Sequence, residues 1–460
     1  MEDMRTQHEN KMGTRPIPGL LLSMALPAII SMFVQAMYNV VDSVFVAQVG
    51  ENALTAVSLA FPVQMLIVSC FVGMGVGINS GISRKLGEKR HRDAERVAEH
   101  GFLVAFIIAI AAALIGILFS ESFAKMFTDN GEIVEGCASY LFVVTVFSFG
   151  SIITQAGFST LQGSGDMIQP MIGQLIGAIV NIVLDPIMIF GLLGFPAMGV
   201  TGAAIATVTG QILAMVYIVC IVLFRKKNLL RLNLRDFKFS GEMIKEIAVV
   251  GLPSAVMQGI GSFMVTGYNL ILAGYGMTAV AVFGVYFKVQ SFIFMPIFGL
   301  GQGAMPIFGY NYGAKNAARF KETLKVGILT ALAIMIVGVL IFQFCPALIF
   351  EKMFNASAEM TAMGVRCFKA ISIAFPVAGG SIMLSTSFQA MGKSYLSMIS
   401  SFLRQMIFLL PFSYLFSLVG GLDMVWYGFI VSELACLTFE IIVYRHFKKK
   451  TFDVWEQQLG

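Results

Sequence analysis

The sequence predicts an all-α membrane protein with twelve transmembrane helices in two parallel six-helix repeats and both termini in the cytoplasm. Three observations predict this fold class. Hydrophobic residues make up 57% of the chain and charged residues only 12%, whereas soluble proteins carry about 25% charged residues. Apolar segments long enough to cross a hydrocarbon core of about 30 Å use most of the 460 residues. The second half of the chain repeats the pattern of the first.

Twelve apolar segments are predicted to be helical spans, each long enough for a bilayer crossing. The first is too long for a signal-peptide core and is kept as a helix. The six cysteines have no metal or redox spacing, so we expect them to be packing residues. The spans lie near residues 20–46, 54–79, 97–119, 136–160, 168–191, 198–224, 247–273, 279–308, 323–344, 362–389, 396–418 and 424–444.

The distribution of lysine and arginine predicts the orientation, because short cytoplasmic loops collect these residues. With the N-terminus inside, 25 of the 31 basic residues fall on the cytoplasmic side. The net charge of +5 is then a topology signal, and no nucleic-acid partner is expected. The predicted parts are a cytoplasmic N-terminus (1–19), an N-lobe (20–224), a linker loop (225–246), a C-lobe (247–444) and a cytoplasmic tail (445–460).

The two halves align on each other at an offset of 226 residues. Pro27 then pairs with Pro253, and the glycines of "GMGVG" (73–77) pair with those of "GLGQG" (299–303). An offset that carries six helices preserves direction, so the repeats are parallel, a layout that secondary transporters use. The glycines lie inside helices, so close helix packing explains them better than dinucleotide binding.

No P-loop motif and no soluble domain is present, so the chain cannot hydrolyse ATP by itself. Any uphill work must draw on an ion gradient. The short loops also leave no room for a catalytic domain, and we expect neither an enzyme nor a cofactor.

Acidic residues in the spans are hypotheses for functional sites, because a charge at the bilayer centre costs roughly 2.5 to 3.5 kcal/mol. We single out Asp42, Asp185 and Glu433. Asp42 and Asp185 are predicted at similar depth in the same half, with Asn181 on the same helix face as Asp185. Thr207 is expected to converge with them. These oxygens suit a hard cation such as Na⁺ or a proton. The alternative role of the acids is structural, as hydrogen-bond partners of neighbouring helices.

The basic residues within the spans differ in their expected roles. Lys288 and Glu433 are predicted at matched depth and are expected to form a structural charge pair in the second half. Arg404 has no acid that we match to it, and either capping carbonyls or lining a cavity remains open for it.

Methionine and phenylalanine are abundant, with 29 and 41 residues. Most must pack or face lipid, yet thioethers and aromatic rings also make adaptable walls that attract organic cations. A cavity with one or two acids and such walls suits amphipathic cations. The expected cavity residues are Gln35, Met37, Tyr38, Phe61, Phe158, Met257 and Tyr268.

Several motifs in order resemble the multidrug and toxic compound extrusion (MATE) transporters. They are "ALPAIISMFVQAMYNVVDSVFVAQVG" (25–50), "LQGSGD" (161–166), "NIVLDP" (181–186), "GAAIAT" (202–207) and "MPIFGYNYGAK" (305–315). The resemblance covers nearly the whole chain. It implies a V-shaped pair of lobes, outward-open and inward-open states, and drug export in exchange for Na⁺ or H⁺.

Within that family the chain looks similar to the DinF-type branch and, there, to MepA-like exporters. This resemblance implies that Asp42, Asn181, Asp185 and Thr207 form the coupling site and that the first helix bends at Pro27. It does not decide between H⁺ and Na⁺. The expected partners are small cationic drugs or dyes and the lipid bilayer, with the chain acting as a monomer in a bacterial cell membrane.

Two alternatives remain open. A lipid-linked precursor flippase of the same superfamily would share the fold, but it would be expected to place several arginines in its cavity. No basic residue lies within the spans of the first half. A channel belongs to a different class, and no filter-like segment supports it.

Overall fold

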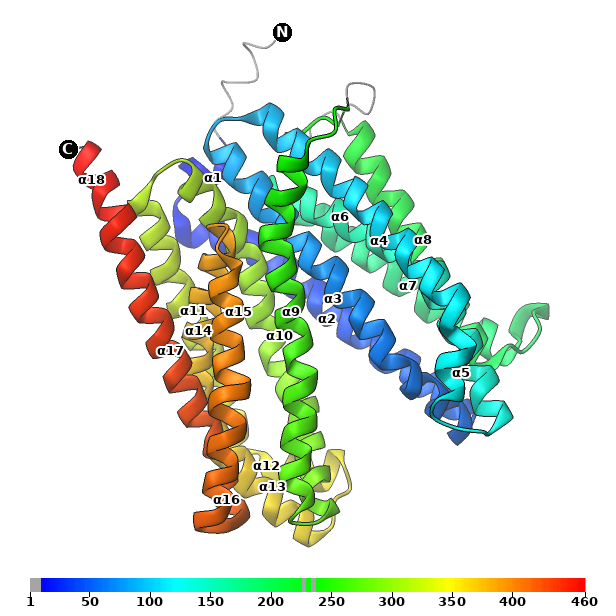
Figure 1. The fold of residues 1–460 in the computed structure, drawn as a ribbon. Helices are drawn as coiled ribbons and strands as arrows, with labels where there is room; N and C mark the ends of the chain where they lie inside the picture. The colour runs from blue at the N-terminus through cyan, green and yellow to red at the C-terminus, as the bar shows by residue number, and fades with distance from the viewer. Residues whose placement is uncertain (1–9, 226–228, 233–236, 460) are drawn as a thin grey trace. The chain divides into compact units, whose positions relative to one another are not determined.

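The computed structural model describes residues 10–225, 229–232 and 237–459, which are almost entirely helical with no strand among them (Figure 1). This confirms the predicted all-α class. Residues 1–9 of the predicted N-terminus, residues 226–228 and 233–236 of the predicted linker and the last residue lie outside the described part.

The chain forms two compact units. The N-terminal unit is Ile30–Ala255, and the C-terminal unit is Met1–Ile29 together with Val256–Gly460. Two units agree with the two-lobe expectation, but the division falls inside helices α2 (Ile17–Val49) and α9 (Gly241–Ala273). The predicted lobes 20–224 and 247–444 therefore differ from the observed units at the beginning of these two helices.

The glycine triplets explain why the division falls there. A Cβ atom at Gly73 of α3 (Glu51–Gly87) would lie 2.5 Å from the carbonyl oxygen of Gly251, in the first part of α9. A Cβ atom at Gly299 of α10 (Met277–Gly313) would lie 2.7 Å from Cα of Ile29, in the first part of α2. Gly73 and Gly299 occupy equivalent positions in the two repeats. Each of them allows the same kind of close helix contact within its own unit. The predicted packing role of these glycines is confirmed.

The helices of the N-terminal unit form a bundle in which α7 packs along α8, and α3 packs against α4, α5 and α6. The predicted fourth span is a pair, α5 and α6, bent by 40°. The elements are α3 (Glu51–Gly87), α4 (His91–Lys125), α5 (Gly131–Val146), α6 (Phe149–Gly163), α7 (Ile168–Phe190), η1 (Leu192–Gly194) and α8 (Gly199–Phe224).

The C-terminal unit has a corresponding bundle, in which α14 packs against α10, α11, α15 and α17. Its predicted tenth span is also a bent pair, α13 and α14, at 47°. The eleventh span contains a π-helical stretch, η4, between α15 and α16. The elements are α1 (Lys11–Thr14), α10 (Met277–Gly313), α11 (Ala317–Phe344), α12 (Pro346–Leu348), η3 (Ile349–Met353), α13 (Ala358–Ser372), α14 (Phe375–Ala390), α15 (Ser394–Phe402), η4 (Leu403–Leu409), α16 (Leu410–Val425), α17 (Gly428–Phe447), η5 (Lys448–Phe452) and α18 (Asp453–Leu459).

Polar residues begin several of these helices, because the first turn of a helix leaves backbone N–H groups unpaired. The Asn130 side chain accepts from the N–H of Glu132 at the start of α5. Asn316 accepts from Arg319 at the start of α11 in the same way. These caps fix the points at which the chain re-enters the bundle.

Among the described residues, nine helices are long and apolar enough to cross a membrane, and the two bent pairs raise this number to 11. The predicted twelfth span is helical as α17, but it carries Glu433, Glu440 and Arg445, so its composition does not mark it as a span. The lipid-facing character of the others is visible on α4, where Leu114 and Leu118 are exposed. The chain is a multi-pass membrane protein, and the count of twelve stays a prediction.

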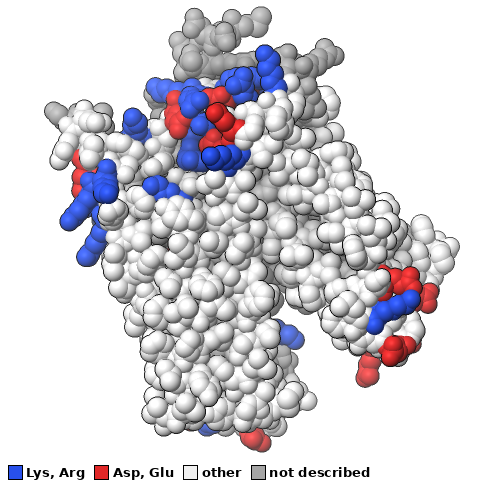
Figure 2. All heavy atoms as spheres, viewed as in Figure 1, with Lys and Arg blue, Asp and Glu red and all other residues white. Residues whose placement is uncertain are grey.

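Charged side chains gather at the ends of the helices of each unit, and the surface between is almost uncharged on the face that Figure 2 shows. In the N-terminal unit, Arg84 and Lys85 at the end of α3 pair with Glu246 of α9. Arg90 pairs with Asp93 beside them. An uncharged band between charged ends is what helices in hydrocarbon require.

Candidate functional site

Helix α7 positions two of the predicted site residues in the interior of the N-terminal unit. Asn181 and Asp185 are four residues apart and lie on one face, with exposed fractions of 3% and 0%. Pro186 follows within the helix. Because proline has no N–H group, the carbonyl of Ile182 loses its helical hydrogen bond beside the carboxylate.

Asn181 joins the carboxylate to the neighbouring helix. Its Nδ2 atom donates to Oδ1 of Asp185 at 3.2 Å and to Oγ1 of Thr207 on α8 at 3.1 Å. Both hydrogens of the amide are therefore used. The structure brings together three of the four predicted coupling residues by direct hydrogen bonds.

Asp42 of α2 is the fourth predicted residue, and it reaches the others through its charge. Its carboxylate interacts electrostatically with that of Asp185 and with the hydroxyl of Tyr140 on α5. Asp42 is itself only partly buried. The predicted convergence of α2, α7 and α8 on one polar cluster agrees with these interactions.

Tyr140 and Gln64 complete the cluster, although the sequence analysis assigns neither of them to the site. Gln64 of α3 donates from Nε2 to the hydroxyl of Tyr140 at 3.2 Å. Gln64 pairs with Gln290 in the repeat alignment, which is the only signal that marks it as a polar position in an apolar helix. Tyr140 carries no such signal, because a tyrosine in a span is ordinary.

Three acceptor atoms of this cluster have no hydrogen-bond partner among the described residues. They are Oδ1 of Asp42, Oδ1 of Asn181 and Oδ2 of Asp185, all of them buried. Buried acceptors without donors are rare in folded proteins, because each costs about 1 to 3 kcal/mol. The cluster is chemically complete when a proton or an oxygen-seeking cation joins it.

The cluster holds two carboxylates and no basic side chain. The interactions that we find around Asp42 and Asp185 come from an amide and hydroxyls, which neutralise no charge. Na⁺, as a transported ion, would find carboxylate, amide and hydroxyl oxygens here. Among the described residues no group of three or more histidine, cysteine, aspartate or glutamate side chains is arranged to hold a metal ion.

Two of the predicted cavity residues are buried and make packing contacts in this structure. Phe158 is buried with Leu161, Ile218 and Val222 in an apolar cluster. Tyr268 is 0% exposed, and its hydroxyl donates to the carbonyl oxygen of Val425 at 3.1 Å. Aromatic residues in spans serve packing and substrate contact alike, so their type alone did not separate the two roles.

The other predicted cavity residues are exposed or partly buried. Gln35, Met37 and Phe61 are exposed in the N-terminal unit, and Tyr38 is partly buried there. Met257 of the C-terminal unit is partly buried. Contact with substrate stays a prediction for these five residues.

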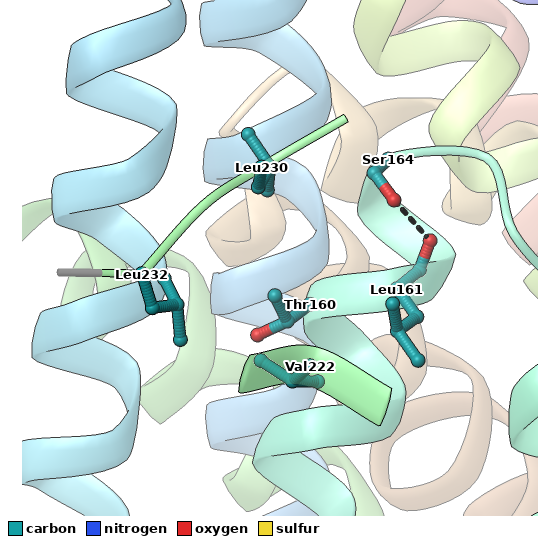
Figure 3. A pocket seen from close by; sticks show the side chains of 6 residues that line it. All are labelled: Thr160, Leu161, Ser164, Val222, Leu230 and Leu232. Atoms are coloured by element: carbon teal, nitrogen blue, oxygen red, sulfur yellow. Dashed lines mark hydrogen bonds between the residues drawn. The ribbon is translucent and has the colours of Figure 1, made fainter. Parts of the chain in front are cut away.

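A small pocket lies among α6, α8 and the segment 229–232 (Figure 3). The hydroxyl of Ser164 bonds to the carbonyl of Leu161, and that of Thr160 bonds to Ala156, so both are satisfied within α6. No titratable side chain lines this pocket. Its lining residues are Thr160, Leu161, Ser164, Val222, Leu230 and Leu232. We interpret it as a packing void and not as a substrate site.

The predicted pair of Lys288 and Glu433 is wrong in this structure. Glu433 of α17 instead lies beside Arg404 of η4, with Oε1 and Nη1 3.5 Å apart. Lys288 is exposed, and none of the described carboxylates lies within 4.0 Å of its ammonium group. Depth counted along the sequence does not specify which helix face a side chain occupies, and Lys288 lies on an exposed face of α10.

Comparison with known proteins gives consistent matches over most of the chain. The MatE family matches residues 27–187 and 253–415. The multidrug export protein MepA of Staphylococcus aureus (strain NCTC 8325 / PS 47) is 27% identical over 345 residues, which cover 74% of this chain and 73% of MepA.

Solved structures match over an even larger share. A MATE crystallised in complex with MaL6 has a TM-score of 0.90 and 25% identity, covering 98% of this chain and 100% of that one. The outward-facing conformation of a multidrug resistance MATE family transporter of the MOP superfamily has a TM-score of 0.89 and 26% identity, covering 98% and 99%. The resemblance stated from the sequence motifs is confirmed.

Proposed function

Since the chain belongs to the MatE family of transporters, we propose that it is a secondary active multidrug efflux antiporter. It exports amphipathic organic cations in exchange for H⁺ or Na⁺ by alternating access. The relatives described above are named a multidrug export protein and a multidrug resistance MATE family transporter. The chain is accordingly a transporter of the cell membrane.

The observation that carries this proposal is the pair of carboxylates without a base in the N-terminal unit. Asp42 and Asp185 bring two negative charges into an apolar bundle, and no described ion pair neutralises either of them. A proton or Na⁺ that joins the open acceptors removes charge from the cluster. An organic cation is attracted to the same negative charge. The ion and the substrate therefore compete electrostatically, even when they contact different atoms.

The first helix supplies the feature that supports a conformational change. Pro27 lies inside α2, and the division between the two compact units falls two residues later, after Ile29. A proline inside a helix weakens the hydrogen-bond ladder and is a common position for a bend. In this proposal, ion binding near Asp42 changes the bend of α2 and so weakens the hold on the substrate.

The proposed orientation places both termini in the cytoplasm, which the lysine and arginine distribution supports. It also places the Asp42 end of α2 in the outer part of the membrane. The substrate therefore leaves from the side at which the coupling ion enters.

Transport in proteoliposomes tests the proposal. Purified protein, an organic cation dye and an imposed pH or Na⁺ gradient are expected to give saturable dye movement against its own gradient. The pH and Na⁺ arms, applied separately, identify the ion. Dye flux that rises linearly with concentration and ignores both gradients would mean a channel. Absence of dye transport, with translocation of a lipid-linked precursor, would mean the flippase.

A further inference from the structure

A second buried polar cluster lies in the C-terminal unit, where α17 packs against α14, α15 and η4. Glu440 of α17 is its centre. This residue is 1% exposed, although it carries an ionisable side chain. It is not among the acids singled out from the sequence, and the proposed coupling site in the N-terminal unit does not involve it.

The hydrogen bonds around Glu440 form a chain that runs across three helices. Ser400 of α15 donates from Oγ to Oε1 of Glu440 at 2.8 Å. The same hydroxyl lies 2.9 Å from Sγ of Cys436. Oγ of Ser381 on α14 lies 3.2 Å from the same sulfur. In the two contacts with Cys436, either atom is able to donate.

This chain has two complete arrangements. When Glu440 is ionised, Oε1 accepts from the hydroxyl of Ser400 and from the thiol of Cys436, which lies 3.8 Å away, while Ser381 donates to the sulfur. When Glu440 is protonated on Oε1, the carboxyl group donates to Ser400, Ser400 donates to Cys436, and Cys436 donates to Ser381. Hydroxyl and thiol groups change direction by rotating, so the chain accommodates either state of Glu440 without moving a helix.

The charges of the cluster do not balance when both acids are ionised. Glu433 and Glu440 bring two negative charges, and Arg404 brings one positive charge, with Nη1 3.5 Å from Glu433. Within the described part of the chain, Arg404 and Glu433 are the charged groups that act on Glu440, and the thiol of Cys436 lies 3.8 Å from its Oε1. Helix α14 has no ionisable side chain. A net negative charge in the interior of a bundle is costly, since each uncompensated buried ion costs several kcal/mol.

A proton resolves this imbalance better than a metal cation does. Na⁺ prefers several oxygen ligands, whereas this cluster offers a thiol and lies beside the guanidinium of Arg404, which repels a cation. The second carboxylate oxygen, Oε2 of Glu440, is buried and has no hydrogen-bond partner among the described residues. Leaving this oxygen without a donor costs more free energy when the carboxylate is ionised than when the carboxyl group is protonated.

We propose that Glu440 is a proton-binding site in the C-terminal unit, and that the side chains of Ser400, Cys436 and Ser381 reorient to accommodate its ionised and its protonated form. Proton uptake forms one O–H bond at Oε1 with a proton from hydronium in bulk water, and release breaks that bond and returns the proton there. This site goes beyond the proposed coupling site and is independent of whether that site uses H⁺ or Na⁺.

Infrared spectroscopy of the purified wild-type protein tests this proposal without any transport. Difference spectra between low and high pH report protonated carboxyl groups through their carbonyl stretch. The wild type is expected to show such a band, and Glu440→Gln is expected to lose one component of it. Glu351→Gln is the matched control, because Glu351 is an exposed glutamate of the same unit. Its spectrum should keep the component that Glu440→Gln loses.

A second variant covers the case in which Glu440→Gln does not fold. Ser400→Ala removes the donor to the ionised carboxylate, so the midpoint of the same component should move to higher pH. A component that is unchanged in both Glu440→Gln and Ser400→Ala would overturn the proposal, as would a wild-type band without pH dependence. Because no drug is involved, failure here leaves the transport proposal intact, and failure of dye transport leaves this result valid.

Discussion

In the N-terminal unit, Asp42 and Asp185 share their surroundings with an amide and hydroxyls, whereas in the C-terminal unit Glu433 and Glu440 share theirs with Arg404. The first cluster has no permanent positive charge and needs an ion to become neutral. The second contains one arginine, which balances one of its two acids and leaves a single negative charge when both are ionised. Two clusters of equal acid content therefore differ in how strongly their charge depends on a transported ion.

The repeat relation makes the comparison more specific. The offset of 226 residues places Tyr268 of the C-terminal unit at the position of Asp42. Tyr268 is packed against Phe283, with ring centroids 4.6 Å apart. The same helical position thus carries an acid in one half and an aromatic packing residue in the other. Duplication preserved the helices and not the ion site.

Replacing Arg404, the arginine of the C-terminal cluster, is expected to have the largest effect on stability. Arg404→Met leaves Glu433 and Glu440 without a positive neighbour, which should cost about 3 to 5 kcal/mol of unfolding free energy. Thermal unfolding in detergent measures this loss as a lower Tm. Glu433→Gln in the same chain should restore part of it.

Lys288→Met is the matched control for Arg404→Met, since Lys288 is also a basic residue of the C-terminal unit but is exposed. Its Tm should stay near that of the wild type. If Lys288→Met lowered the Tm as much as Arg404→Met, the assignment of the charge pair to Arg404 and Glu433 would be contradicted.

Weakening the N-terminal cluster is expected to have a smaller effect, on ion binding and not on folding. Asn181→Ala removes the donor to Asp185 and to Thr207, and a hydrogen bond to a charged group contributes roughly 1.5 to 3 kcal/mol. The coupling-ion concentration needed for half-maximal dye efflux should change at least about tenfold. It should rise if the ion is Na⁺, which loses the amide oxygen as a ligand, and fall if the ion is H⁺, because the ionised carboxylate loses a donor. Thr207→Val should cause a smaller change, because Asn181 retains its bond to Asp185. Equal effects of the two variants would mean that Asn181 does not organise the carboxylate.

The sequence predicted the fold class and most of the N-terminal cluster, because hydropathy and repeated motifs are local signals. Asn181 and Asp185 share a helix face by spacing alone, and "GAAIAT" marked Thr207. The sequence did not reveal the partners that depend on helix rotation. Arg404 lies in η4, and no sequence signal specified that its guanidinium faces Glu433.

Glu440 was missed for a related reason. It lies near the predicted cytoplasmic end of its span, where an acid is ordinary, and only the structure shows that it is buried. The sequence also did not reveal that the first part of α2 belongs to the C-terminal unit and the first part of α9 to the N-terminal unit. The glycines at these contacts were identified as packing positions, but a glycine in the sequence does not indicate which helix packs against it.

The central claim is that Asp185 couples an ion to drug export, and one variant tests it most directly. Asp185→Asn keeps the shape of the side chain and removes the buried charge, so the protein should fold with an unchanged or slightly higher Tm. Glu51→Gln, at an exposed acid of the same unit, is the control. The measurement is gradient-driven efflux of an organic cation dye from proteoliposomes, normalised to the amount of reconstituted protein. We expect Asp185→Asn to fall to the rate of protein-free vesicles, with no remaining response to H⁺ or Na⁺, while Glu51→Gln transports as the wild type does. A folded Asp185→Asn protein that exports dye at the wild-type rate under the same gradient would contradict the account and show that this acid is structural.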